Sequence, residues 1–304
     1  MKNNKSKVLI TKNKDRTSAV EEILKVFDLE NFSGQKVALK ANYNSADQFP
    51  ASTHPETLRS LIDCLKRAGT RKITLLERSG MGNTRKVLEK RGVFKLSSEM
   101  DFEVVVLDEI ERDSWVKIER NGTHWLKGFY LPSLLCEADK VVQTCCLKTH
   151  GFGGHFTISL KNSVGLVSKR LPGSLYDYMA ELHISPYQRS MIAEINHYYP
   201  VDLLLMDATK AFIDGGPATG TIVEPGLILA SKDRVALDAV GVAILRYHGT
   251  TRNVSQGKIF ELTQIKRAAE LGVGVSSENK IELVPLDDES QKWAVDLERI
   301  LKTQ

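Results

Sequence analysis

The sequence alternates between two hydrophobic periods, and this alternation constrains the fold more than any other feature. Short β-branched runs such as 7–11, 36–42 and 72–76 are typical of strands, and stretches with helical spacing lie between them. Strands that alternate with helices usually pair in parallel and are covered on both faces. The sequence therefore predicts an α/β fold, with a mainly parallel sheet and helices on both faces. Further strands are expected at 102–107, 139–146, 201–207, 227–231 and 280–284, and helices at 17–29, 53–69, 84–90, 156–167, 185–197, 233–247, 258–271 and 289–301.

One segment breaks this rhythm. Residues 115–129 alternate around Asn121-Gly122, a pair typical of two-residue turns, so we expect a β-hairpin insertion near residues 115–129. No repeat or low-complexity linker divides the chain, and 1–304 is predicted as a single α/β domain or as two closely packed α/β lobes. The irregular stretch 171–185 is a candidate lid or hinge.

Charge and hydropathy narrow the classes of partner. The 42 Lys and Arg residues exceed the 38 Asp and Glu residues by only four, and aromatic side chains do not interleave with basic ones, so nucleic-acid binding is not expected. No apolar run approaches the roughly 18–20 residues of a membrane span, so no membrane partner is expected. The polar start at residues 1–5 lacks the apolar region of a signal peptide, which predicts a cytoplasmic protein.

The four cysteines do not have the spacing of a metal or cluster site. Cys64, Cys136, Cys145 and Cys146 contain no C-x-x-C pair, and neighbouring residues in a strand point to opposite faces. A four-cysteine iron–sulfur cluster is therefore not expected, and buried reduced thiols are the simplest interpretation.

Polar residues follow the predicted strands at their carboxyl ends, where open α/β sheets bind ligands. Because the carboxyl ends of parallel strands meet at one edge, we expect these residues to surround a single crevice. Those expected there are Asn42, Glu77, His150, Lys161 and Asp207.

The segment 148–165 is the richest in chemical groups. Three glycines, Gly151, Gly153 and Gly154, are predicted to join a strand to a helix, as in loops that bring backbone N–H groups to an anion at a helix N-terminus. Their spacing matches neither of the two common nucleotide-binding glycine motifs. An ordinary glycine-rich turn with solvated basic residues is the alternative.

Basic and imidazole side chains crowd this segment. Lys148 and Lys161 are predicted to hold an anion, and His150 to transfer a proton or bind a metal, with His155 as the second candidate. Asn42 and Asn162 would position the ligand.

Acidic residues beyond a later strand could complete the site. Asp207 or Asp214 would orient an imidazole or join His150 or His155 as a metal ligand. The alternative is that Asp207 only ends a strand and Asp214 only caps a turn. Gly216 would supply a positive φ for a tight turn or a close approach to a ligand.

Several of these residues resemble a known family. The run Lys148-Thr149-His150, followed by Thr157, Leu160-Lys161-Asn162 and Gly165, is similar to the central signature of the domain of unknown function 362 family. The resemblance covers about residues 36–250. Many members are known as iron–sulfur proteins because they carry a ferredoxin-like four-cysteine cassette, which this chain lacks. The family has no general reaction, so the resemblance implies little chemistry. The strand, glycine-rich loop and helix also resemble the nickel-dependent lactate racemase group faintly.

The sequence thus predicts an enzyme that acts on a small anionic ligand, a carboxylate or a phosphate compound. The alternative is a non-catalytic protein that binds a ligand or cofactor for a redox or biosynthetic partner. The cofactor and the oligomeric state stay open, and a metal ion is left as an option. The predicted catalytic residues are Lys148, His150 and Lys161, the ligand-binding ones Asn42, Glu77, Gly153, Gly154, Asn162 and Gly216, and the metal ligands His150, His155, Asp207 and Asp214.

Overall fold

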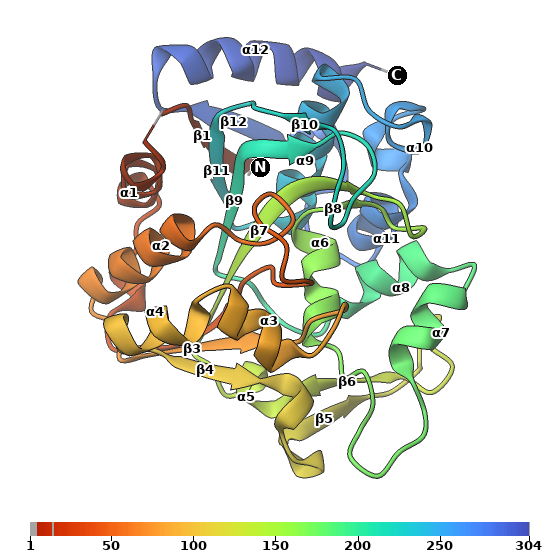
Figure 1. Cartoon of the computed structure of the whole chain (residues 1–304). Helices are drawn as coiled ribbons and strands as arrows, with labels where there is room; N and C mark the ends of the chain where they lie inside the picture. Colours follow the sequence, from red (N-terminus) through yellow and green to blue (C-terminus); the bar gives the residue numbers. More distant parts are fainter. Residues whose placement is uncertain (1–4, 14, 304) are drawn as a thin grey trace.

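A mixed ten-stranded sheet forms the centre of the protein (Figure 1). The computed structural model describes residues 5–13 and 15–303, so the polar start at 1–4 lies outside the described residues. The strand order is β12-β1-β11-β9-β7-β2-β3-β4, with β10 paired to β9 and β8 paired to β7. The strands are β1 (Ser6–Thr11), β2 (Lys36–Lys40), β3 (Lys72–Glu77), β4 (Glu103–Val106), β7 (Lys140–His150), β8 (His155–Thr157), β9 (Leu203–Phe212), β10 (Ile222–Val223), β11 (Leu227–Ser231) and β12 (Ile281–Pro285).

The middle of the sheet is parallel, as the alternating sequence predicts. Strands β9, β7, β2, β3 and β4 all run in the same direction, whereas β11 is antiparallel to both of its neighbours, β9 and β1. The predicted α/β class with a mainly parallel sheet is confirmed. Five parallel strands bring their carboxyl ends to one edge, which is where such folds place ligands.

Helices cover both faces of the sheet. Alternate residues of β9 show the division, because Leu203 and Leu205 pack with α1 and α2 while Leu204 and Met206 pack with α9. The helices are α1 (Arg16–Val26), α2 (Pro55–Arg67), α3 (Thr84–Lys90), α4 (Val93–Met100), α5 (Ser133–Cys136), α6 (Ser159–Asn162), α7 (Tyr178–Ile184), α8 (Gln188–Ile195), α9 (Arg234–Tyr247), α10 (Arg252–Ser255), α11 (Thr263–Glu270) and α12 (Asp288–Lys302). Short 3-10 turns are η1 (Glu30–Phe32), η2 (Leu107–Glu109), η3 (Arg112–Ser114), η4 (Ser163–Leu166), η5 (Ile259–Glu261) and η6 (Glu278–Lys280).

The predicted β-hairpin insertion is present, but its turn is wider than the sequence suggests. Strands β5 (Trp115–Ile118) and β6 (Phe129–Pro132) form a separate antiparallel pair that ends at Ile118 and Phe129. Residues 119–128 therefore form a loop rather than a two-residue turn at Asn121-Gly122. Trp125 explains the difference, since its side chain is buried against Phe129 and its Nε1 donates to the Met191 carbonyl. Burying so large an aromatic outweighs the local turn preference.

The predicted helix at 156–167 is wrong in its first three residues. Residues 155–157 form β8, which turns back on β7, and only the short α6 and η4 follow. Phe156 and Ile158 are both buried, and this alternation fits a strand as well as a helix over so few residues.

Within residues 5–13 and 15–303, no helix combines the length and the apolar character that crossing a membrane requires.

Candidate functional site

A cavity of about 410 Å³ opens at the carboxyl ends of β2, β3 and β7. Its walls combine residues that follow these strands with residues of α6 and α7. They include Lys40, Asn42, Glu77, Arg78, Met81, Lys148, His150, Phe152, Thr157, Lys161, Asn162, Gly165, Met179, His183 and Pro217.

Strand β7 brings two of the predicted residues to the cavity. Lys148 and His150 are two positions apart, so both side chains point to the same face of the sheet. β7 runs to His150 because β8 pairs with its last three residues, and Lys148 lies opposite Thr157 in this ladder. The β7–β8 turn therefore determines where Lys148 and His150 lie, and it replaces the strand-to-helix loop that the glycines suggest.

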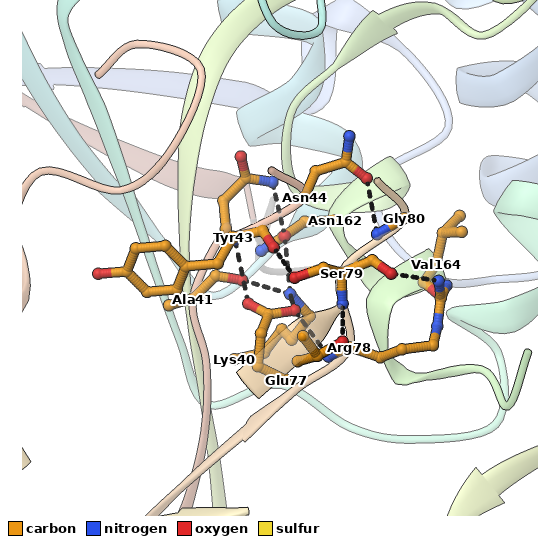
Figure 2. A network of polar contacts seen from close by, with 12 residues as sticks. Lys40, Ala41, Tyr43, Asn44, Glu77, Arg78, Ser79, Gly80, Asn162 and Val164 are labelled. Atoms are coloured by element: carbon orange, nitrogen blue, oxygen red, sulfur yellow. Dashed lines mark hydrogen bonds and ion pairs between the residues drawn. The ribbon is translucent and has the colours of Figure 1, made fainter. Parts of the chain in front are cut away.

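A buried ion pair closes the inner wall. The Lys40 Nζ lies 2.7 Å from the Glu77 carboxylate, and both side chains are almost fully buried. Glu77 also accepts hydrogen bonds from the backbone N–H groups of Tyr43 and Arg78, at 3.1 and 3.0 Å (Figure 2). Burial raises the pKa of Glu77 and lowers the pKa of Lys40, and their mutual attraction opposes both shifts. Gly165 permits this packing, because a Cβ there would lie 2.9 Å from the Lys40 Nζ.

Two amides connect this pair to Lys148. Asn162 Oδ1 accepts from Lys40 Nζ at 3.2 Å and from Asn42 Nδ2 at 3.0 Å. Asn42 Oδ1 in turn accepts from Lys148 Nζ at 2.9 Å. The Asn162 Nδ2 donates to the carbonyl of Thr144 at 3.0 Å, so both amide groups are held in one orientation.

Three buried cations of the cavity have no carboxylate partner among the described residues. Lys148 donates to Asn42 and to the carbonyl of Ala51, and Arg78 donates to backbone carbonyls, including that of Val167 at 2.9 Å. The Lys161 side chain makes no hydrogen bond or ion pair to any residue that the structure describes, although the residue is only 8% exposed. The cavity therefore has an excess of positive charge.

Burial lowers the pKa values of all three of these cationic groups. Burial lowers the pKa of Lys148 and of Arg78. Burial, and then the charges of Lys148 and Arg78, lower the pKa of Lys161 to about 7. Near neutral pH, Lys161 is therefore present both as the ammonium ion and as the free amine.

His150 is uncharged under the same conditions. Burial and the neighbouring Lys161 and Lys148 lower the pKa of His150 far below its ordinary range. Its Nδ1 accepts a hydrogen bond from the N–H of Phe152 at 3.2 Å. A neutral ring with Nδ1 as acceptor carries its hydrogen on Nε2, so His150 is a hydrogen-bond donor at that atom.

The structure brings six predicted residues together around the cavity and gives the glycines other roles. The six are Asn42, Glu77, Lys148, His150, Lys161 and Asn162. Gly153 and Gly154 lie in the β7–β8 turn, and a Cβ on Gly154 would lie 2.5 Å from Lys161 Cε. Gly216 has a φ of +68°, and its carbonyl accepts from the N–H of Gly151 at 3.2 Å.

The expected anion at a helix N-terminus is a carboxylate of the protein itself. Asp238 in α9 accepts from the backbone N–H groups of Ser159 and Leu160, at 2.8 and 3.2 Å. It is fully buried, as expected for an acidic residue in an apolar helix that has a partner. The start of α6 is thus already satisfied, and Lys161 serves the cavity rather than this helix end.

The predicted metal ligands do not meet. Asp207 lies outside the cavity, where it accepts from Arg16 Nε at 2.9 Å and from Thr57 and Thr209. Asp214 is exposed and caps a turn through the N–H and hydroxyl of Thr221. His155 pairs across the ladder with His150. In the described part of the chain, no three His, Cys, Asp or Glu residues are grouped so that they could hold a metal ion.

Some lining residues carry no site signal in the sequence. Arg78 directly follows Glu77, which was predicted as a site residue because it ends a strand. Including the next residue after that strand would have found Arg78. Met179 and His183 come from α7, inside a stretch that the sequence marks only as irregular. Thr157 lies opposite Lys148 only because β8 pairs with β7.

The fold and the cavity define an α/β protein with a cationic site at the carboxyl ends of parallel strands. The profile described as "Domain of unknown function (DUF362)" matches residues 37–243, more than half of the chain, and the protein belongs to this family. A search of the curated proteins finds no match.

One similar solved structure is the lactate racemase apoprotein from Thermoanaerobacterium thermosaccharolyticum. It shares 18% sequence identity over 67% of this chain and 50% of that chain, with a TM-score of 0.40. This chain therefore matches about half the length of that protein. A TM-score this low supports no argument about chemistry.

Proposed function

We propose that this protein is an enzyme that binds a small carboxylate or phosphate compound in the cavity and transfers a proton through Lys161. One observation carries the proposal, namely that Lys148, Lys161 and Arg78 converge on the cavity with no carboxylate partner among the described residues. Burying a cation without a counter-charge is costly unless hydrogen bonds or an ion compensate it. An anionic ligand would supply that compensation.

The lysines would bind and react, and the other groups would position the ligand. Lys148 is fixed by its hydrogen bond to Asn42, while the Lys161 side chain has free hydrogen-bonding capacity for the ligand. A pKa of about 7 lets Lys161 accept or donate a proton at neutral pH. Neutral His150 would donate from Nε2, and the Thr157 hydroxyl is buried without a partner in the described structure. His150 is thus a positioning group here, and Lys161 replaces it as the proton carrier.

The shifted pKa favours an enzyme over a passive binder. A binding protein needs only hydrogen-bond donors for the anion, which Lys148 and Arg78 already provide. A lysine whose pKa lies near neutrality can also exchange a proton at neutral pH, which suits acid–base chemistry.

Calorimetric titration with sulfate and with acetate at pH 6.5 tests the site. We expect Lys161→Met to weaken binding of both anions by roughly 10- to 100-fold, the usual worth of a charge-assisted hydrogen bond. The matched control is Lys258→Met, which removes the same charge from an exposed lysine outside the cavity. Equal binding by the wild type and Lys161→Met, or binding by neither, would refute the proposal.

A further inference from the structure

The cavity is larger than a simple anion requires. Its volume of about 410 Å³ falls in the range of roughly 300–1,000 Å³ that is typical of pockets for drug-sized ligands. Acetate or phosphate bound at the lysines would leave much of this space unfilled. The residues that line the rest of the cavity therefore indicate the chemistry of the rest of the ligand.

The inner part of the cavity is cationic, and its mouth carries apolar side chains beside polar ones such as Lys169 and His183. Lys148 is fully buried and Lys161 is 8% exposed, so the cationic part lies deep. Met81 and Phe152 also line the cavity but are 44% and 63% exposed, so they lie at its mouth. Met179 of α7 adds a further apolar surface. The body of a ligand whose acid group reaches the lysines would extend along these apolar side chains.

Hydrogen bonds hold the backbone at Met81 and Phe152 before any ligand arrives. The N–H of Met81 donates to the Asn44 carbonyl at 2.8 Å, and Gly80 donates to the Asn44 side chain at 3.2 Å (Figure 2). On the other side, the N–H of Phe152 donates to His150, and its ring makes an edge contact with the His150 ring. Because the backbone is already ordered, an apolar group can bind to these side chains without a further loss of backbone entropy.

We infer that the ligand is an amphipathic anion, in which a carboxylate or phosphate carries an apolar, planar body. The acid group lies at Lys148 and Lys161, and the body lies between Met81 and Phe152. This inference rests on the proposed anion site and specifies its substrate class. An aromatic face on Phe152 and an adaptable thioether on Met81 are both suited to a flat apolar group. A hydrophilic ligand would instead leave both side chains against polar atoms.

Calorimetric titration at pH 6.5 with acetate, phenylacetate and gluconate tests this inference. All three are monocarboxylates, and they differ only in the presence and polarity of the body. We expect phenylacetate to bind at least about tenfold more tightly than acetate, because its ring is removed from water on binding. Gluconate should bind no more tightly than acetate. In Phe152→Ala, the preference for phenylacetate over acetate should fall to about threefold or less, while acetate affinity is unchanged.

Leu126→Ala is the matched control, since Leu126 is similarly exposed at 66% and is not a cavity residue. It should keep the full preference for phenylacetate. Equal affinities for acetate and phenylacetate, a preference for gluconate, or an undiminished preference in Phe152→Ala would overturn the inference while leaving the anion site intact. If none of the three binds and sulfate also fails to bind, the proposed function itself falls.

Discussion

The affinity of the cavity for an anion should decrease as pH rises through about 7. Lys161 attracts an anion only when it is protonated, and its pKa is about 7. About nine-tenths of Lys161 is protonated at pH 6 and about 3% at pH 8.5. If only the protonated form binds, affinity falls about 30-fold between these values, which corresponds to about 2 kcal/mol.

Sulfate is a suitable probe because its charge does not change between pH 6 and 8.5. Titration calorimetry at constant ionic strength would give the dissociation constant at each pH, with circular dichroism confirming that the fold persists. The charged and titratable groups that face Lys161 are Lys148, Arg78 and His150, and Lys169, Asp177 and His183 also line the cavity.

Variants of the residues that line the cavity would show which group causes the decrease in sulfate affinity. Lys161→Met should bind sulfate weakly at every pH, with no decline above pH 7. His183→Gln should keep the decline of the wild type, and so should Lys169→Met. Sulfate affinity that is constant from pH 6 to 8.5 in the wild type, or a decline that persists in Lys161→Met, would refute the reasoning.

The same shift affects the stability of the ligand-free protein. The folded pKa of Lys161 lies below the ordinary lysine value of 10.5, so the unfolded chain binds more protons between pH 7 and that value. The burial penalty is therefore complete below pH 7 and disappears as pH rises. Relative to Lys161→Met, the wild type should gain stability between pH 7 and 9, measured by urea unfolding.

Three further changes test the wall of the site. Gly165→Ala should lower the unfolding free energy by about 1–3 kcal/mol, because its Cβ would lie 2.9 Å from Lys40 Nζ and 3.0 Å from Glu77 Oε1, and urea denaturation would measure this loss. Lys40→Met should cost about 3–5 kcal/mol by leaving Glu77 buried and unpaired, and the double variant with Glu77→Met should recover much of it in the same assay; additive losses would contradict a direct pair. Asp238→Ala should cost about 3 kcal/mol by orphaning the backbone donors at the start of α6, and unchanged thermal stability would show that this cap is dispensable.

Local hydrophobic period was sufficient to predict the class of fold. Strands β2, β3 and β7 begin where β-branched runs begin, and α9 and α12 match the predicted helices within one residue at each end. The spacing of apolar residues gave the wrong element where elements are short, as in β8. Three residues are too few to distinguish the pattern of a strand from that of a helix. The two-residue turn predicted for the insertion is wrong for another reason. The burial of Trp125 depends on tertiary packing, which the local sequence does not show.

The edge of the candidate site was predictable, but the distance of each residue from that edge was not. Asp207 ends one predicted strand and Lys148 follows another, so the strand-end argument treats them alike. In the structure Asp207 lies five residues before the end of β9, in register with Cys146, and binds Arg16, 191 residues away. The strand order determines the edge, whereas the actual length of a strand and its bulges determine how far a residue lies from that edge. Here β9 continues to Phe212, and its register with β7 shifts after Asp207.

The sequence also does not show which charged groups are neutralised by a partner of opposite charge. Lys40 is paired with Glu77, and the helix end before Lys161 is satisfied by Asp238, 79 residues away from Ser159. Each of these counter-charges comes from a distant part of the chain, and together they remove two apparent anion sites from consideration. Lys161 is different, because its glycine neighbour Gly154 leaves room for its side chain and no described carboxylate meets it. We propose Lys161 as the reactive group because no described carboxylate pairs with it, whereas a spacing motif alone would have assigned Lys40, Lys148 and Lys161 the same role.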